Sequence, residues 1–487
     1  MHPLAKLDHQ FVWHPFTQMR DWLRAEPIVI VEGRGAVLRD ARGREYLDAN
    51  SSIWTNLHGH RHPRLDAALR RQLGRIAHSS ALGLANEPAS HLAARLVAAA
   101  NPPAVAGPRL AKVFFSDDGS TALEVALKLA YEFTRRCGRS ARPRFLSLAG
   151  GYHGDTMGAV SLGHIDRFHA AYRGLLFKTG AVMAPYCYRC PHNRAAPERR
   201  DAREHRRCQW ECVAQVERKF SRARAAGRAI SAFVVEPLIQ GAAGMIPQPA
   251  GWLRQVAEIA RAHNALLIAD EVLTGFGRTG TGTAEEWETG GGAGKARPAS
   301  LFACHREGVQ PDFLCLAKGL TGGYLPMAAT LTTPAVFDAF LGEYGEFKTF
   351  FHGHSYTGNQ LGAAVALASL ELLEAPAQQR RRRRLEELLR AELRPLWQLP
   401  AVGDIRQVGL IAGIELVADW QRRTPFDLRR GVGQRVSAAM ARRGVLTRPI
   451  GNVIVLMPPY CTAPAQLRRM VAVLAEGIEE ATAGQNP

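Results

Sequence analysis

Short apolar runs alternate with helical patterns from about residue 112 onward, and this alternation narrows the possible folds more than any other feature. The run KVFFS leads through DDGS into TALEVALKLAYEF, where apolar residues recur at the spacing of one helix face. The next expected strands are RFLSLAG, AFVVEP, ALLIADEV and FLCLAKG. They are rich in aliphatic residues without strict polar alternation, as in strands covered on both faces. The sequence therefore predicts an α/β fold around a mainly parallel central sheet.

The organisation of the chain changes near residue 346. A long helical stretch, TGNQLGAAVALASLELLEA, is followed by an arginine-rich helix and by VGDIRQVGLIAGIEL, whose alternation is typical of a hairpin. We therefore expect a large domain over residues 71–345 and a smaller α+β domain over residues 346–487. Two segments interrupt the large domain: a cysteine-containing insertion over residues 186–212 and a Gly-rich stretch over residues 281–300, which predicts a surface loop.

Charge and hydropathy limit the partners of the chain. The net charge of +18 and the arginine cluster at 380–384 raise the question of nucleic-acid binding. The cluster leads into the helical pattern LEELLRAEL without any nucleic-acid-binding motif, so we interpret it as a solvated helix end and expect no nucleic-acid partner. No apolar run approaches the roughly 20 residues of a membrane helix, and no secretory signal pattern opens the chain. These features predict a cytoplasmic protein without a membrane partner, and a non-enzymatic basic protein that binds nucleic acid is the alternative from another class.

Four of the eight cysteines fall within one insertion. Cys187 and Cys190 form a C-x2-C pattern, and Cys208 and Cys212 form a C-x3-C pattern, which is a spacing compatible with structural zinc. A surface insertion whose thiols bind no ligand explains the same pattern. We favour that second interpretation and predict no metal. The other four cysteines are scattered, which is typical of a reduced intracellular protein.

Polar residues directly follow several of the expected strands. Gly119 and Ser120 open a helix after KVFF, and a glycine together with the free N–H groups of a helix start suits an anion such as phosphate. Tyr152 lies in GYHGDT after RFLSLAG, where its ring can pack either against a ligand or in the core. Ligands of doubly wound sheets bind beyond the carboxyl ends of the strands, so these residues are candidates for one site.

Two charged residues complete this set. Asp270 follows ALLIA and Lys318 follows FLCLA, so both charges lie behind apolar runs, where burial costs free energy. A structural salt bridge is one explanation. In pyridoxal phosphate chemistry, a desolvated lysine forms the Schiff base with the cofactor and an aspartate pairs with the pyridine nitrogen. The sequence therefore predicts a pyridoxal phosphate enzyme, because a phosphate loop, an aromatic residue, an aspartate and a lysine lie together at successive strand ends.

These stretches resemble the class III pyridoxal-phosphate aminotransferases over nearly the whole chain. The motifs that carry the resemblance are WHPFTQM, SDDGSTALEVALK, GYHGDT, IADEVLTGFGRTG, LAKGLTGG and FHGHSYTGN. The resemblance implies a fold type I enzyme with a large cofactor domain and a small α+β domain formed from both termini, residues 1–70 and 346–487. It also implies a homodimer whose active sites lie at the interface.

The resemblance also implies roles for individual residues. Three are catalytic: Lys318 matches the Schiff-base lysine, Asp270 the carboxylate that keeps the pyridine nitrogen protonated, and Tyr152 the residue against the cofactor ring. The matches to phosphate contacts are Gly119 and Ser120, with His354 and Ser355 given by the neighbouring subunit. The matches to substrate contacts are Phe16, Ile53, Trp54, Tyr152, Gly353 and Arg448, with the Arg448 guanidinium on a carboxylate.

Within the family, WHPFTQM, SSIWTNLHGHRHP, GYHGDTMGAVSLG and LTRPIGNVIVLMPPY resemble the branch that aminates 8-amino-7-oxononanoate to 7,8-diaminononanoate in biotin biosynthesis. Members that use S-adenosylmethionine as amino donor typically have tyrosine where this chain has Phe16 and Val455. They have tryptophan in place of Ile53, and Pro-Thr in place of His354 and Ser355. PFTQM, HGHSYTGN and GGYLP instead resemble members that use lysine, so the sequence leaves both donors open.

The alternative function is that of another class III transaminase, which acts on an ω-amino acid or a diamine. It would share Lys318, Asp270 and the phosphate loop, and only Trp54, Arg448 and the MPPY segment oppose it. Arg406 lies in a region where other class III enzymes can bind a carboxylate through an arginine, but we expect a structural role for it here.

Overall fold

The computed structural model describes residues 1–280 and 300–483. Seven strands form the central sheet, in the order β4 (Lys112–Ser116), β12 (Ala328–Thr332), β11 (Phe313–Leu316), β10 (Leu266–Asp270), β7 (Ala232–Val235), β5 (Phe145–Leu148) and β6 (Gly180–Val182). Strand β12 is antiparallel to both of its neighbours, and the other neighbouring pairs are parallel. The prediction of an α/β fold with a mainly parallel sheet is therefore confirmed.

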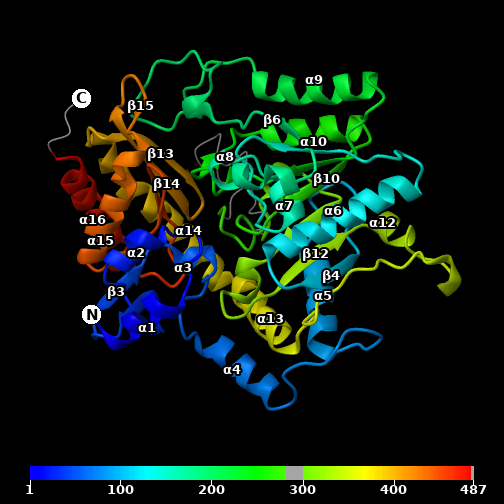
Figure 1. The fold of residues 1–487 in the computed structure, drawn as a ribbon, viewed down its shortest axis with the longest axis horizontal. Coiled ribbons are helices and arrows are strands. Elements are labelled where there is room, and N and C mark those ends of the chain that lie inside the picture. Colours follow the sequence, from blue (N-terminus) through cyan, green and yellow to red (C-terminus); the bar gives the residue numbers. More distant parts are fainter. Residues whose placement is uncertain (281–299, 484–487) are drawn as a thin grey trace.

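Helices cover both faces of this sheet. Helix α6 (Gly119–Arg136) packs on one face, where it meets alternate strand residues such as Leu266 and Ile268. The residues between them, such as Leu267, face a second layer that includes α5 (Glu87–Ala99), α9 (Glu211–Ala225) and α10 (Trp252–Ala262). Helices α9 and α10 lie side by side (Figure 1). Burial on both faces explains why these strands are almost uniformly aliphatic.

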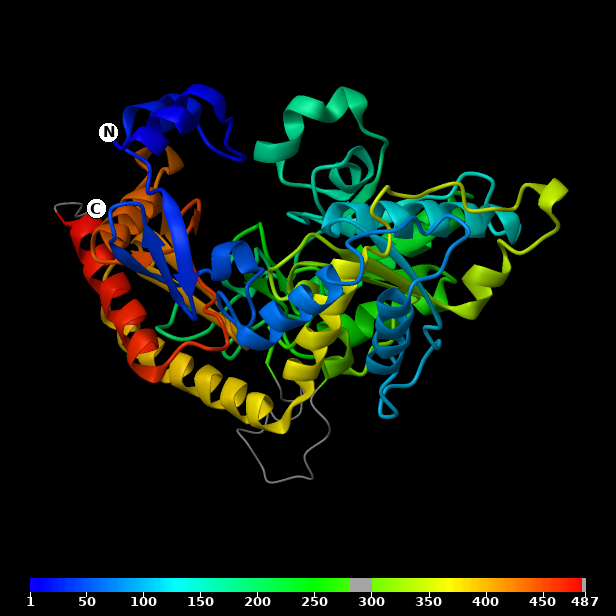
Figure 2. The same cartoon turned by 90° about the horizontal axis from the view of Figure 1, so that it is seen from below.

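The two ends of the chain share a sheet. Strands β1 (Ile30–Arg34), β2 (Val37–Asp40) and β3 (Glu45–Asp48) are joined by the C-terminal strand β16 (Val445–Leu446), which pairs in parallel with β3. Both termini accordingly lie on the same side of the molecule (Figures 1 and 2). The exact boundaries of a small domain, at residues 70 and 346, stay a prediction.

A second C-terminal sheet is antiparallel. Its strands are β13 (Val402–Val408), β14 (Ile411–Asp419), β18 (Val453–Leu456), β17 (Pro449–Ile450) and β15 (Thr424–Pro425). Strands β13 and β14 form the hairpin expected from VGDIRQVGLIAGIEL. A further two-stranded sheet joins β8 (Ile239–Gln240) to β9 (Ile246–Pro247).

The remaining helices frame these sheets. They are α1 (Pro3–Phe11), α2 (Met19–Arg24), α3 (Ser51–Trp54), α4 (Pro63–Leu73), α7 (Met157–Leu162), α8 (Asp166–His169), α12 (Pro334–Asp338), α13 (Gln360–Glu374), α14 (Pro376–Leu393), α15 (Val432–Arg442) and α16 (Pro464–Thr482). None of the helices in the described part of the chain is long and apolar enough to cross a membrane. The Gly-rich stretch expected as a surface loop lies, apart from Ser300, outside the described residues.

The arginine cluster at 380–384 differs in one respect from a solvated helix end. It lies inside α14, and four of its side chains are exposed. Arg382 is buried, donates a hydrogen bond to the Leu373 carbonyl (3.1 Å), and lies with its guanidinium carbon 5.4 Å from the centre of the Tyr460 ring. The expectation is therefore wrong for Arg382, because one face of α14 packs against the core.

Candidate active site

A cavity of about 720 Å³ lies at the carboxyl ends of five strands that run in the same direction: β4, β5, β7, β10 and β11. Residues at or just beyond these strand ends form much of its wall: Gly119, Ser120, Tyr152, His153, Glu236, Asp270 and Lys318. Parallel strands end at the same edge of a sheet, so residues far apart in the sequence meet there. Sequence analysis singled out Gly119, Ser120, Tyr152, Asp270 and Lys318, and the structure brings all five to this cavity.

Lys318 begins a short 3-10 turn (Lys318–Thr321) after β11. Its backbone φ is +36°, a left-handed value that residues other than glycine rarely adopt. Its Nζ lies 5.1 Å from the centre of the Trp54 ring. Burial lowers the pKa of the Lys318 ammonium, and the charges of Asp270 and Glu236 oppose that shift. A lower pKa favours the neutral amine, which is the form that acts as a nucleophile and as a base.

Asp270 ends β10 and is held by two hydrogen bonds. Its Oδ2 lies 2.7 Å from Nδ1 of His153, and its Oδ1 accepts a hydrogen bond from the N–H of Val272 (3.1 Å). The two side chains are 6% and 1% exposed, so they form a dry pair. Burial by itself would lower the pKa of His153, but the hydrogen bond and the charge of Asp270 raise it above its ordinary value. The pair keeps a fixed carboxylate at the floor of the cavity.

Glu236 is a further buried carboxyl of this wall. It accepts hydrogen bonds from the N–H groups of Tyr152 (3.3 Å) and Gly241 (2.8 Å). Burial, with a smaller contribution from the charge of Asp270, raises the pKa of Glu236 to about 7, against the opposing effects of His153 and the two N–H donors. Glu236 therefore anchors the backbone that carries Tyr152, whose hydroxyl donates to Asp155 (2.7 Å).

The start of α6 offers a place for an anion. The N–H groups of Gly119 and Ser120 have no acceptor inside the helix, as is general for a first helical turn. The chain packs closely around this turn. A Cβ on Gly119 would lie 2.6 Å from Val272, and a Cβ on Gly154 would lie 2.3 Å from the Ser120 hydroxyl oxygen. That hydroxyl in turn pairs with Thr156 (2.7 Å), so both glycines are needed to shape the cradle.

Residues 51–54 enter the cavity through a strained turn. All four have positive φ, including +109° at Ile53, which is an outlier for a β-branched residue. Asp48 holds the turn by accepting hydrogen bonds from the N–H (3.0 Å) and the hydroxyl (3.1 Å) of Ser52. The turn buries the Trp54 indole beside the lysine and leaves Ile53 44% exposed.

Phe16 and Arg448 lie next to the cavity rather than in its wall. The Arg448 Nη2 donates a hydrogen bond to the Phe16 carbonyl (2.8 Å). The Phe16 ring meets the Tyr152 ring edge to face, with 6.4 Å between their centres. Ile53 is likewise beside the wall, as the neighbour of Trp54. Three of the expected substrate contacts thus surround the cavity without lining it.

The segment that contains Gly353, His354 and Ser355 also lies outside the cavity wall. The His354 Nδ1 is 3.0 Å from Oδ2 of Asp117, which does line the cavity. The Ser355 carbonyl lies 2.9 Å from Nε2 of His78. This segment therefore borders the phosphate cradle of its own chain, and its expected contact with a neighbouring subunit stays a prediction.

Comparison with known proteins identifies the family. The model of the family "Aminotransferase class-III" matches residues 19–478. The chain belongs to this family. As a class III aminotransferase it is a pyridoxal phosphate-dependent enzyme with the fold type I architecture.

Individual relatives agree with the family. An adenosylmethionine-8-amino-7-oxononanoate aminotransferase from Nitratidesulfovibrio vulgaris is 48% identical to this aminotransferase over 96% of its chain and 80% of the relative. The crystal structure of the enzyme of the same name from Methanocaldococcus jannaschii has a TM-score of 0.85 and 38% identity, with 98% of both chains covered. An omega transaminase from Pseudomonas jessenii, in complex with PMP, has a TM-score of 0.85 and 27% identity, with 99% and 98% of the two chains covered.

The residues of this aminotransferase fit the cofactor. One cavity brings together three groups: a lysine with a lowered pKa, a carboxylate fixed at the cavity floor, and a helix start beside two glycines that have no room for a side chain. These are the groups that pyridoxal phosphate needs for covalent attachment, for its ring nitrogen and for its phosphate. Arg406, in contrast, is buried between Asp404 (2.9 Å) and Glu415 (2.6 Å), in agreement with the expected structural role.

His153 and Glu236 are charged or titratable residues of the cavity wall to which the sequence alone gave no role. His153 stood in the quoted motif GYHGDT, and a histidine beside a tyrosine gave no reason to pair it with Asp270, 117 positions away. Glu236 follows the expected strand AFVV in the same way that Asp270 follows ALLIA. The same rule applied to both carboxylates would have found it.

Proposed function

We propose that this aminotransferase transfers an amino group to 8-amino-7-oxononanoate, with adenosylmethionine as the donor, and so forms 7,8-diaminononanoate in biotin biosynthesis. The observation that carries the proposal is the 48% identity, over 96% of the chain, to a relative named for this reaction. The guanidinium of Arg448 beside the cavity supports it, because the acceptor carries a carboxylate at the end of its chain. We expect the enzyme to work in the cytoplasm, because a reaction between small metabolites does not require a membrane.

The proposed roles follow from the geometry of the cavity. Pyridoxal phosphate, when bound, supplies an electron sink and carries the amino group between the two substrates. Lys318 would hold the cofactor covalently between turnovers. Once released, its neutral Nζ removes the proton from the donor carbon that bears the amine. Asp270, kept in place by His153, would pair with the ring nitrogen of the cofactor and favour its protonated form.

The other residues bind and orient. The N–H groups of Gly119 and Ser120 hold the phosphate at the start of α6, and Tyr152 packs against the ring. Trp54 contacts the substrate from the cavity wall. Phe16, Ile53 and Gly353, which lie outside that wall, contact the substrate where it enters. His354 and Ser355 reach the phosphate of the neighbouring subunit.

Lysine is a second candidate for the donor. Members of the branch that depend on adenosylmethionine typically have a tyrosine at the position of Phe16 and a tryptophan at the position of Ile53. Phe16 lacks the tyrosine hydroxyl, and Ile53 lacks the aromatic ring. Ile53 is exposed beside the cavity, so an aliphatic side chain there offers no platform on which an adenine can stack.

A comparison of the two donors tests the proposal. The purified enzyme, loaded with cofactor and given adenosylmethionine alone, is expected to lose the visible absorbance of its cofactor. It should regain that absorbance, and release 7,8-diaminononanoate, when 8-amino-7-oxononanoate follows. The same cycle with lysine and not with adenosylmethionine would assign the donor to the second candidate. An enzyme that turns over ω-amino acids but never aminates 8-amino-7-oxononanoate would contradict the proposed acceptor.

We further propose that the enzyme is a homodimer. The described surface exposes several large apolar side chains, notably Trp13 (86% exposed), Tyr344 (93%) and Phe351 (71%). Exposed apolar groups of this size are characteristic of surfaces that another chain covers. A second copy would also bring the His354 segment close to a second phosphate cradle.

Replacement of Arg448 tests the carboxylate contact. The change Arg448→Gln is expected to lower kcat/KM for the keto acid about 10- to 100-fold, mainly through KM, because a hydrogen bond to a charged group contributes roughly 1.5–3 kcal/mol. The half-reaction with the amino donor should be affected much less. Arg469→Gln, which alters an exposed arginine of α16, is the matched control and should leave both half-reactions unchanged. An equal loss in both half-reactions would place Arg448 in a general structural role.

A further inference from the structure

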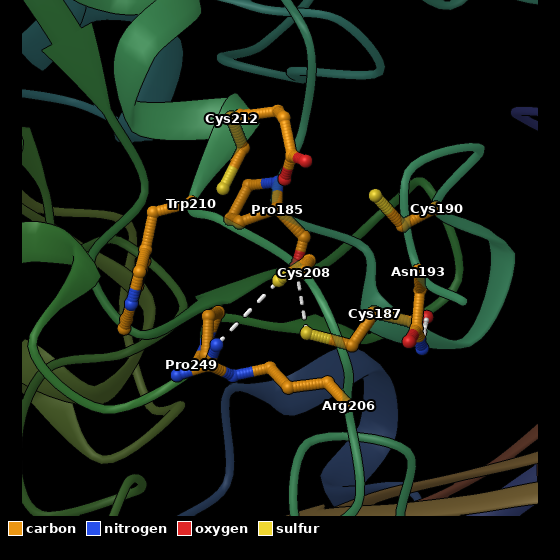
Figure 3. Close-up of a pocket in the computed structure, with 10 residues that line it drawn as sticks. Pro185, Cys187, Cys190, Asn193, Arg206, Cys208, Trp210, Cys212 and Pro249 are labelled. Atoms are coloured by element: carbon orange, nitrogen blue, oxygen red, sulfur yellow. Dashed lines mark hydrogen bonds between the residues drawn. The ribbon is translucent and has the colours of Figure 1, made fainter. Parts of the chain in front are cut away.

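The four cysteines of the insertion line one small cavity. Cys187, Cys190, Cys208 and Cys212 line this space of about 10 Å³, which is close to the size of a single small occupant (Figure 3). Cys187 lies in the 3-10 turn η2 (Cys187–Arg189), which Cys190 directly follows, and Cys212 lies in the first turn of α9. The two ends of the insertion thus place four cysteines along the wall of one cavity. None of the four takes part in a disulfide.

The two halves of this cysteine cluster are tied together by a polar residue. Asn193 donates a hydrogen bond from its side chain to the Cys187 carbonyl (2.9 Å) and accepts one from the N–H of Arg207 (2.9 Å). The backbone N–H of Asn193 also donates to the Cys190 carbonyl (3.1 Å). The hydrogen bonds of Asn193 therefore hold the two halves of the cysteine cluster close together.

A cation stands next to the thiols. Arg206 donates a hydrogen bond from Nη1 to the Cys208 sulfur (3.5 Å), and its guanidinium is held over the Trp210 ring at 4.1 Å (Figure 3). Four thiolates around a divalent ion leave a net negative charge, which a neighbouring arginine offsets.

The insertion has only a small apolar core of its own. Its own apolar cluster contains only Cys187, Tyr188 and Ala202, with Tyr186 packed against it. A segment of this size with so small a core usually needs a disulfide or a metal as a staple. The insertion nevertheless makes precise contacts with the C-terminal sheet. Arg189 pairs with Glu415 (2.6 Å) on β14, and Arg199 donates to the Val402 carbonyl (2.7 Å) on β13.

From these observations we propose that Cys187, Cys190, Cys208 and Cys212 bind one structural Zn²⁺ ion, and that the ion fastens the insertion which clamps the C-terminal sheet. Four cysteine ligands in a C-x2-C and a C-x3-C pair are the donor set of a closed, tetrahedral zinc site. Within the described residues, no cluster of potential ligand side chains is already arranged to hold a metal ion. Binding therefore requires the four cysteine side chains to reorient toward the shared cavity. The site shares no residue with the active-site cavity, so it is independent of the proposed reaction.

Metal analysis of the full-length holoenzyme tests this inference. Protein purified without chelators or metal-affinity resin is expected to contain about one zinc per chain. The variant Cys208→Ser should lose most of that zinc, whereas Cys137→Ser, a change at an exposed cysteine outside the cluster, should keep it. Cobalt offered in place of zinc should give the absorbance of thiolate-to-cobalt charge transfer. Removal of the metal should lower the unfolding midpoint by roughly 5 °C or more.

Three results would overturn the zinc site. They are wild-type protein with less than about a tenth of a zinc per chain and no cobalt–thiolate absorbance, iron in place of zinc, and disulfides among the four cysteines. If Cys208→Ser does not fold, the metal content and the cobalt spectrum of the wild type decide the question by themselves.

Discussion

Replacement of Lys318 by alanine is expected to reduce turnover at least about 10⁴-fold, the upper range for removal of a positioned acid–base group. Among the described residues that line the active-site cavity, Lys318 is the only lysine, so no other amine in the described wall can take its place. The phosphate cradle and Asp270 are untouched by the change, and the variant should therefore still bind pyridoxal phosphate. Steady-state assays with saturating substrates, together with the absorbance of the bound cofactor, measure the two effects separately.

The matched control is Lys178→Ala, which removes an exposed lysine that does not line the active-site cavity. It should retain wild-type turnover. Small primary amines added to Lys318→Ala are expected to restore part of the activity, because the missing group is a base of that class. Sustained turnover by Lys318→Ala without added amine would show that another residue carries the proton.

Replacement of Asp270 by asparagine is expected to lower kcat at least about 10²-fold, in the range found when one preorganised electrostatic contact is removed from an active site. Asparagine has the same shape and can still bond to His153, so the fold should persist. What disappears is the negative charge that would hold a proton on the ring nitrogen. The measurement is kcat at saturating substrate and cofactor, with circular dichroism as the check on folding.

Asp338→Asn serves as the matched control for this change, because Asp338 is an exposed carboxylate at the end of α12. It should behave as wild type. The variant His153→Gln should lose less activity than Asp270→Asn, because it leaves the charge in place and removes only the group that orients it. If Asp270→Asn keeps kcat within about two-fold of wild type, the ring nitrogen does not depend on this carboxylate.

Much of the fold was predictable because the signals are local. Each central strand is a short aliphatic run, and the polar residue at its end is visible in the sequence, as with Asp270 after β10 and Lys318 after β11. The rule that ligands bind at the carboxyl ends of parallel strands then brings these residues together without any coordinates. The resemblance to the family then indicated which role each of these residues has.

The features that escaped prediction depend on long-range contacts. The positive φ values of residues 51–54 rely on packing that includes a hydrogen bond from Ser51 to the Met457 carbonyl, 406 positions away. The burial of Arg382 depends on which face of α14 meets Tyr460, and an arginine run does not show this. The association of the four cysteines was visible only as spacing, and their meeting at one cavity required the fold.

The central claim is that Lys318 carries pyridoxal phosphate at the carboxyl edge of the sheet, and borohydride reduction tests it most directly. The reagent converts the bond between an enzyme lysine and the cofactor into a stable amine, which mass spectrometry can locate after proteolysis. We predict a single labelled peptide that contains Lys318, and no label when the donor has been added first. A label on any other lysine, or none on a yellow and active enzyme, would contradict the account.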